Sequence, residues 1–418
     1  MTTAEQRAIA ARLKAERERR GWGQRKMARF LRDAVDDPQK PELPSFVTYV
    51  KRWESGKVPV TDSRYRTAYA AVFGMDENEL FAPDRSAPPS LWRAPALDGE
   101  LGPDEEERLI LAARRPVRAD PVVVESLATI LAAQRRTEDM IGSAALIEPV
   151  RAQLATIQEL VIEARGPIRP EVVNVAAQWA QFAGWLHIAT GDLESAREWL
   201  NRATDWSIEV GDLALTDSIT SWKGYLAEHA GHLGPMIGMA QAAQRHRSGP
   251  GRAYDLHMEA RGHALVGDRA AADRALNAAC EAVAAARPAD ARQWEYYYFA
   301  PGFWNLERGV ALRYMGRNDP ARTQQAIEQL ATGHAALPAD MRGSEWGGVY
   351  LCHQAAAHLE AGDAESAVAV ASDALAVAHA TSSESLIGRV RRLHRRLADD
   401  WPGRSDVAEL GEALAAGT

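Results

Sequence analysis

One recurring arrangement of small residues limits what the C-terminal half of the chain can fold into. It is clearest around Gly191, which precedes Asp192 and has small residues seven positions before it, Gly184, and five positions after it, Ala196. Similar arrangements surround four further glycines: Gly231, Gly267, Gly316 and Gly362. Because small side chains let two helices cross closely on either side of a tight turn, the arrangement predicts a row of helix pairs.

The spacing of these glycines indicates what kind of repeat the chain contains. Successive glycines are 40, 36, 49 and 46 residues apart. The array resembles tetratricopeptide repeats, whose standard unit is about 34 residues long, so its copies are lengthened or divergent. The resemblance predicts a repeat domain over residues 171–418. The last predicted helix, 386–399, carries five arginines and is expected to be a solvated cap.

In tetratricopeptide arrays the first helix of each pair lines the concave inner wall. The resemblance therefore implies a ligand-binding wall of eight residues: Trp179, Gln181, Trp185, Tyr225, Tyr254, His257, Arg261 and Phe303. Neighbouring wall positions are Ser221, Glu228, Leu306 and Arg313. Aromatic rings beside a few polar groups suit a peptide or a small molecule, although packing between repeats explains the same rings equally well. The aromatic run 294–299 is expected in the core rather than in a pocket wall.

Composition favours an all-α chain. Ala, Leu, Glu and Arg are abundant, and aromatic residues make up only 7%. No apolar run reaches the roughly 18 to 20 residues of a membrane span, and the charged N-terminus lacks the apolar centre of a secretory signal. We therefore expect a cytoplasmic protein. Cys280 and Cys352 form no metal-binding or redox spacing and are expected to be buried thiols.

Charge divides the chain into a basic head and an acidic body. Residues 1–66 contain 16 Lys and Arg against 9 Asp and Glu, whereas the whole chain has a net charge of −8. This asymmetry is typical of a protein in which one domain contacts nucleic-acid phosphates and the other does not.

Five short helices are predicted in the head. Apolar spacing and capping residues place them at Thr3–Arg20, Gln24–Ala34, 46–57 after a Ser45 N-cap, a fourth after Asp62 or Ser63, and Glu77–Phe81. A segment rich in Pro and acidic residues, 36–44, separates the second helix from the third.

The order of residues in these helices resembles the Cro/repressor-type (XRE) helix-turn-helix domain over about residues 4–81. The resemblance is carried by Gln24-x-x-x-Ala28, by Val50-x-x-Trp53-Glu54-x-Gly56-Lys57, and by Gly74 with Glu79-Leu80-Phe81. The turn of roughly a dozen residues before the third helix is longer than the family's usual turn. The family pattern implies base contacts from Val47, Thr48 and Arg52, phosphate contacts from Gln24, Tyr49, Lys51 and Lys57, and a buried ion pair between Arg17 and Glu54.

Two segments join the head, 1–81, to the repeats. Residues 82–120 form a Pro-rich linker with a short helix that begins at Pro103 or Asp104, and residues 121–170 form a helical connector. The connector helices either cover the first repeat or form a dimer seam, and the sequence leaves both roles open.

No catalytic motif is present. The chain has no Gly-rich phosphate loop, metal-binding His-Glu-x-x-His helix or serine elbow, so we expect no enzyme activity, no cofactor and no metal. His229 and His232 flank a repeat turn and lack further ligands nearby.

The combination resembles the peptide-sensing, quorum-sensing helix-turn-helix regulators with tetratricopeptide repeats of Gram-positive bacteria. The resemblance implies a homodimer that binds double-stranded DNA and whose repeats bind a peptide or small-molecule effector, with no membrane partner. The alternative is a protein-interaction scaffold that its head tethers to DNA.

Overall fold

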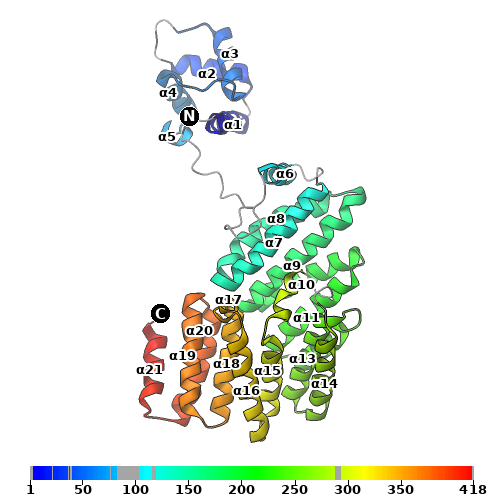
Figure 1. Ribbon diagram of the computed structural model, residues 1–418. Coiled ribbons are helices and arrows are strands. Elements are labelled where there is room, and N and C mark those ends of the chain that lie inside the picture. The colour runs from blue at the N-terminus through cyan, green and yellow to red at the C-terminus, as the bar shows by residue number, and fades with distance from the viewer. Residues whose placement is uncertain are drawn as a thin grey trace. The chain divides into compact units, whose positions relative to one another are not determined.

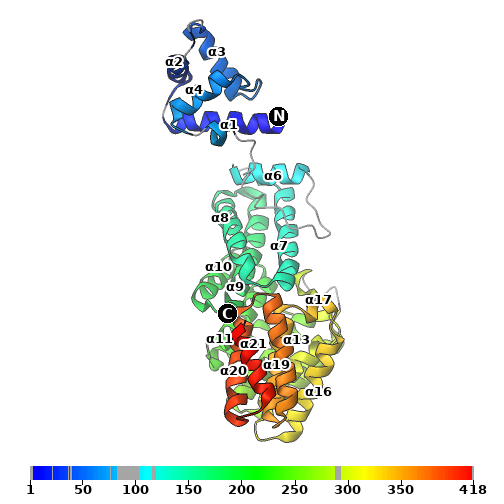
Figure 2. The same cartoon turned by 90° about the vertical axis from the view of Figure 1, so that its left-hand side faces the viewer.

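The computed structural model describes residues 3–20, 22–35, 37, 40–75, 77–81, 103–114, 119–287 and 293–416. The chain divides into two compact units, Met1–Ser90 and Leu91–Thr418, which are described separately below. All regular secondary structure in the described ranges is helical (Figures 1 and 2). None of the helices in these ranges is both long and apolar enough to cross a membrane.

The described residues of unit 1 form five helices around one small core. They are α1 Thr3–Arg19, α2 Gln24–Ala34, α3 Leu43–Glu54, α4 Ser63–Phe73 and α5 Glu77–Leu80. Apolar side chains spaced three or four positions apart meet in the core, among them Leu13, Met27, Leu31, Phe46, Val50 and Tyr69. A helix of about a dozen residues is unstable alone in water, so this shared core is what keeps α3 folded.

The start of α3 differs from the sequence prediction. The helix begins at Leu43, with Pro44 in its first turn, and not after an N-cap at Ser45. Proline is compatible with the first turn because the backbone N–H that it lacks would have no helical partner there. The connection from α2 is therefore eight residues, 35–42, rather than a dozen. After α3 the chain turns at Gly56 in a left-handed conformation, φ +69°.

Unit 2 begins with three helices that precede the repeats: α6 Pro103–Arg114, α7 Pro121–Ile141 and α8 Ile147–Glu163. Leu109 of α6, Leu127 of α7 and Leu154 of α8 share one buried cluster with Trp179 and Leu200 of the first repeat. Of the two roles that the sequence left open for the connector, packing on the first repeat is therefore observed. Residues 82–102 and 115–118 of the predicted linker lie outside the described residues.

Six helix pairs follow and stand side by side in Figure 1. They are α9 Arg169–Ala189 with α10 Leu193–Glu209, α11 Leu213–His229 with α12 Leu233–Ala243, α13 Gly249–Val266 with α14 Arg269–Ala285, α15 Phe303–Met315 with α16 Pro320–Ala336, α18 Glu345–Glu360 with α19 Ala364–Ala380, and α20 Glu384–Asp400 with α21 Ser405–Ala416. Short helices lie between some of these: η2 Ala144–Leu146, η3 Gly166–Ile168, η5 Gln293–Phe299 and α17 Ala339–Arg342.

The predicted turns join the two helices of five pairs. Four of the marker glycines adopt the left-handed conformation expected of a tight turn: Gly191, Gly231, Gly267 and Gly362. At the fourth pair Asn318 takes the left-handed conformation instead of Gly316. The fourth pair shows the close helix crossing that the small residues predict, because a Cβ on Gly309 would lie 2.7 Å from the Leu330 side chain. A further turn of the same kind, at Gly211, connects α10 to α11.

Two expectations about the repeats are wrong. Helix α20 is not a solvated cap, because α21 packs beside it and Leu386, Val390 and Leu397 are buried. Of the two cysteines, Cys352 is buried but Cys280 is exposed.

Candidate functional site

The third helix of unit 1 is fixed by a buried ion pair at its end. Arg17 Nε on α1 donates to Glu54 Oε1 at 2.7 Å, and both side chains are almost fully buried. Arg17 also donates to the Trp22 carbonyl, and Gln24 Nε2 at the start of α2 donates to Glu54 Oε2 at 3.2 Å. Because Glu54 contacts both α1 and α2, it holds α3 in one orientation. Gln24 thus has a structural partner as well as its predicted phosphate role.

The outward face of α3 carries four of the predicted nucleic-acid contacts on exposed positions: Thr48, Lys51, Arg52 and, just beyond the helix, Lys57. Thr48 Oγ1 donates to the Pro44 carbonyl within the helix, and the side chain is exposed. Guanidinium, ammonium, hydroxyl and methyl groups are those that contact DNA base edges and phosphates.

Val47 and Tyr49 are half-buried. The Tyr49 ring contacts Phe46, Trp53 and Tyr65, so most of this side chain belongs to the aromatic core. The family resemblance implied a phosphate contact for Tyr49, but its four-residue spacing to Trp53 places the two rings together.

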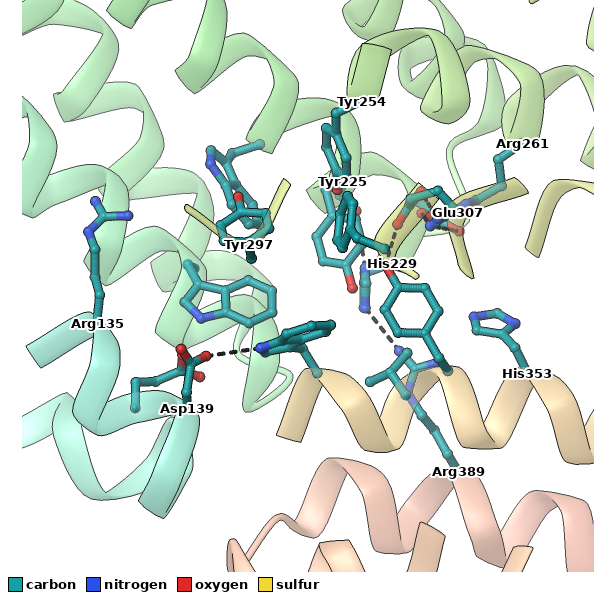
Figure 3. Close-up of a pocket in the computed structure, with 18 of the residues that line it drawn as sticks. Arg135, Asp139, Tyr225, His229, Tyr254, Arg261, Tyr297, Glu307, His353 and Arg389 are labelled. Atoms are coloured by element: carbon teal, nitrogen blue, oxygen red, sulfur yellow. Dashed lines mark hydrogen bonds and ion pairs between the residues drawn. The ribbon is translucent and has the colours of Figure 1, made fainter. Parts of the chain in front are cut away.

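Unit 2 contains a cavity of about 370 Å³ on the inner side of the repeat array (Figure 3). Side chains from the first helix of every pair line it, from α9, α11, α13, α15, α18 and α20, together with α7 and η5. Two groups of rings form its walls: Trp185, Trp222 and Tyr225 contact one another, as do Tyr297, Phe303 and Trp346.

The α7 end of the cavity carries two carboxyl groups with raised pKa values. Asp139 accepts hydrogen bonds from Trp346 Nε1, at 3.0 Å, and from the Tyr296 hydroxyl. Burial and the neighbouring Asp139 raise the pKa of Glu138 to about 8, and burial raises the pKa of Asp139 to about 6. Arg135 stacks over the Phe182 ring, and burial lowers its pKa to about 10.

The centre of the cavity is held by a buried charge network. Arg261 of α13 donates to Glu228 of α11 at 3.0 Å and to Glu307 of α15 at 2.7 Å. Tyr350 of α18 donates to the same Glu307. Burial and the negative charge of Glu307 raise the pKa of Tyr254 and Tyr350 well above their usual range. Four repeats are thus joined through one guanidinium and two carboxylates.

The α20 end of the cavity differs from its centre, because the arginine here contacts a neutral group instead of a carboxylate. The nitrogen Nη2 of Arg389 is 3.1 Å from His229 Nε2, and His229 Nδ1 is 3.1 Å from the Tyr225 carbonyl. Since Nδ1 must donate to that carbonyl, Nε2 accepts from Arg389 and the ring is neutral. Burial and then Arg389 lower the pKa of His229, with Glu228 opposing them, and burial lowers that of His353 well below its usual value.

Six of the eight predicted wall residues line this cavity: Gln181, Trp185, Tyr225, Tyr254, Arg261 and Phe303. Two do not. Trp179 is fully buried, and its Nε1 donates to the Leu127 carbonyl at 3.1 Å. It precedes Trp185 by six positions, which places the two side chains on different faces of α9. His257 is buried against Trp304 and donates from Nδ1 to the Ala253 carbonyl.

Of the neighbouring wall positions, Glu228 lines the cavity, and Ser221, Leu306 and Arg313 are not among its lining residues.

Sequence reasoning missed several lining residues. His229 and Glu307 lie one helical turn beyond Tyr225 and Phe303, so this spacing could have identified them. The run 294–299 contributes Tyr296 and Tyr297 to the wall, contrary to the expected core role, whereas Tyr298 is buried. The Trp294 side chain lies outside the described residues. No periodic signal marked Asp139 or Arg389, because they come from helices outside the five recognised repeats.

Among the described residues, no group of three or more His, Cys, Asp or Glu side chains is placed to hold a metal ion.

No protein-family model matches the chain, and no curated protein matches it. Among solved structures, the crystal structure of the APC/C hetero-tetramer Cut9–Hcn1 is similar over 92% of this chain and 79% of that chain, with 10% sequence identity and a TM-score of 0.34. This likeness is too weak to carry an inference about fold or function. The description of the fold and the proposal for the function rest on the geometry described above.

Proposed function

We propose that the chain is a sequence-specific DNA-binding regulator in which α3 of unit 1 contacts base edges and unit 2 binds an effector. The observation that carries the proposal is α3 itself: its inner face is fixed by the Arg17–Glu54 pair, and its outer face exposes Arg52, Lys51 and Thr48. A helix held rigidly by a second helix, with cationic and hydroxyl side chains outward, suits a DNA major groove.

The charge distribution supports the same proposal. Basic residues outnumber acidic ones in 1–66, although the whole chain is acidic. An arginine on α3 can bind the O6 and N7 atoms of guanine, and lysines around it can bind phosphate oxygens. We propose a homodimer, because two half-sites on DNA call for a two-fold symmetric protein, and a cytoplasmic location, where DNA is accessible.

The cavity supports the effector half of the proposal. It is lined by aromatic rings together with charged and polar groups at its ends and centre, and its volume of about 370 Å³ is within the roughly 300 to 1,000 Å³ of small-molecule sites. This size favours a small molecule over a long peptide. An effector alters DNA binding only to the extent that it binds one arrangement of the protein more tightly than another.

Selection from a random DNA library tests the first half of the proposal. Full-length protein is incubated with random duplexes, and bound DNA is amplified over several rounds and sequenced. We expect one motif, with two related half-sites, to be enriched. Enrichment of no motif would contradict the proposal.

A second candidate is a protein-interaction scaffold. It is favoured by apolar side chains that unit 2 leaves in solvent: Ile162, Ile208 and Leu213 are 65%, 63% and 55% exposed. If this candidate is correct, Ile208→Lys abolishes binding of a macromolecular partner while small molecules fail to change the melting temperature. Retained partner binding in that variant would exclude a role for Ile208 in that contact.

A further inference from the structure

Two arginines at the α20 end of the cavity lack a counter-charge. Arg389 and Arg392 both line the cavity from α20. Among the described residues neither forms an ion pair, and the hydrogen bond of Arg389 goes to neutral His229. The other two arginines of the cavity are different, because Arg261 has two carboxylate partners and Arg135 donates to Gln181.

The histidines beside these arginines are neutral and supply no negative charge. His353 accepts from Arg313 at its Nδ1, at 2.9 Å, so its hydrogen is on Nε2. Burial, Arg313, Arg261 and Arg389 together keep His353 uncharged, as the lowering of its pKa indicates. Arg313 itself pairs with a carboxylate, that of Glu360, at 2.9 Å. The α20 end therefore carries two guanidinium groups that form no ion pair with any of the described residues and that lie beside uncharged imidazole rings.

A guanidinium in a partly enclosed site is stable only when an anion or several acceptors replace the water that it loses. Its planar arrangement of N–H groups matches the two oxygens of a carboxylate or phosphate group. Arg389 is half-buried and Arg392 is exposed, which places the first inside the cavity and the second at its edge. An anion that enters the cavity at this end contacts Arg392 at the edge and then Arg389 inside.

The aromatic walls indicate the chemical character of the part of the ligand that does not contact the arginines. Trp185 and Tyr225 lie 6.0 Å apart, centroid to centroid, and Trp346 lies at the same distance from Tyr350. Flat rings of this kind stack on flat apolar molecules. The acidic end, with Glu138 and Asp139, is lined by carboxyl groups that burial keeps largely or partly protonated, so it accommodates neutral polar atoms rather than a second anion.

We propose that the effector is a small organic oxyanion, a carboxylate or phosphate on a flat aromatic body, whose oxygens bind Arg389 and Arg392 and whose body lies between the aromatic walls. This inference rests on the effector half of the proposed function. Its test needs no DNA, so its failure is distinguishable from a failure of DNA binding.

A panel of matched probes tests the proposal on the full-length protein. It pairs aromatic carboxylic acids, from benzoic to indole-3-acetic and naphthoic acid, with their carboxamides and includes the corresponding aryl phosphates. Titration calorimetry measures binding at pH 7. We expect at least one acid or phosphate to bind with one-to-one stoichiometry, and its amide to bind about tenfold or more weakly, since a charge-assisted hydrogen bond contributes about that factor. Comparison of the carboxylic acids with the aryl phosphates shows which oxyanion the site prefers.

Two variants of α20 complete the test. Arg389→Gln is expected to reduce affinity for the acid to that of the amide, whereas Arg396→Gln, an equal change of charge at an exposed position that does not line the cavity, is expected to bind as the parent protein does. Melting temperatures without probe establish that both variants are folded. Should Arg389→Gln unfold, Arg392→Gln replaces it.

The proposal is overturned if no acid or phosphate of the panel binds, if acid and amide bind equally, or if the Arg389 and Arg396 variants lose affinity to the same extent.

Discussion

At the scale of single residues, Arg52 carries the proposed sequence preference. Replacement of Arg52 by Ala removes the guanidinium from the outer face of α3 without touching the core, because this side chain is exposed. We expect affinity for the selected DNA motif to fall about 10- to 100-fold, which is the usual value of one good base contact, with little change on scrambled DNA.

Fluorescence anisotropy with labelled duplexes measures this effect. Lys14→Ala is the matched control, because Lys14 is an exposed cation on α1. If Arg52→Ala keeps the full preference, or if Lys14→Ala loses it equally, the role assigned to α3 is wrong.

The ion pair behind α3 is a second residue-scale feature with a measurable consequence. Glu54→Ala leaves Arg17 buried without its carboxylate, and we expect unit 1 to lose about 3 to 5 kcal/mol of stability. Glu42→Ala breaks the exposed Arg32–Glu42 pair, where less than about 1 kcal/mol is expected.

Hydrogen exchange of the α1 and α3 amides reports both changes. Protection should drop by several powers of ten in Glu54→Ala and remain nearly unchanged in Glu42→Ala. Similar losses in the two variants would show that Glu54 is not the contact that fixes α3.

The raised pKa of Glu138 predicts a pH dependence of unit 2. Burial raises this pKa to about 8, above the ordinary value of 4.5, so between these values the folded protein binds more protons than the unfolded chain. Stability contributed by the protonated group is therefore present at low pH and is lost as pH rises through the folded pKa.

We expect the melting temperature of unit 2 to fall between pH 5 and pH 8.5, and Glu138→Gln to flatten this fall. Asp139, whose pKa is also raised, retains part of the dependence. Glu148→Gln, at an exposed position on α8, serves as the control and should melt like the parent protein at every pH. An unchanged slope in Glu138→Gln would contradict the burial of a protonated Glu138.

At the scale of elements, the end of α7 joins the start of the array to its far end. Ser143 donates from its backbone N–H to Glu345 of α18 at 3.0 Å, across 202 positions of sequence. Gly142 lies against Thr381, where an added Cβ would be 2.3 Å from the Thr381 carbonyl oxygen.

Gly142→Ala should therefore separate α7 from the start of α20. It combines backbone strain at φ +84° with a direct clash, and we expect a loss of about 2 to 4 kcal/mol together with faster hydrogen exchange at residues 138–146 and 381–387. Gly191→Ala has a similar φ, +83°, with nothing within 4 Å, and should lose only about 1 kcal/mol. Equal effects in the two variants would mean that strain alone, and not the junction, is responsible.

The element scale also explains what the sequence could predict. Helix pairs with a tight turn leave a local pattern: Gly191 adopts the left-handed φ of the turn, and Gly309 must be small because of Leu330, 21 positions later. The five helices of unit 1 follow from equally local spacing and caps, such as Asp62, whose side chain accepts from the Arg64 N–H. The contacts of α7 and α20 with the cavity join residues 160 to 207 positions apart, and local spacing cannot reveal them.

At the scale of the whole molecule, we propose that a basic unit binds DNA and that a helical-repeat unit with an aromatic cavity binds an effector. The two assignments rest on different observations: the rigid, cationic outer face of α3, and the cavity with its arginines that lack a counter-charge. Either assignment can be wrong while the other is correct. The DNA assignment is the central claim, because the regulatory role of the cavity depends on it.

One measurement tests this claim most directly: the affinity of the full-length protein for the selected DNA motif and for a scrambled duplex, by anisotropy over a series of salt concentrations. The account predicts that the motif is bound about a thousandfold or more tightly, and that the logarithm of affinity for both duplexes falls linearly with the logarithm of salt concentration as phosphate contacts release counterions. Equal affinity for the two duplexes, or an affinity that does not respond to salt, would contradict it.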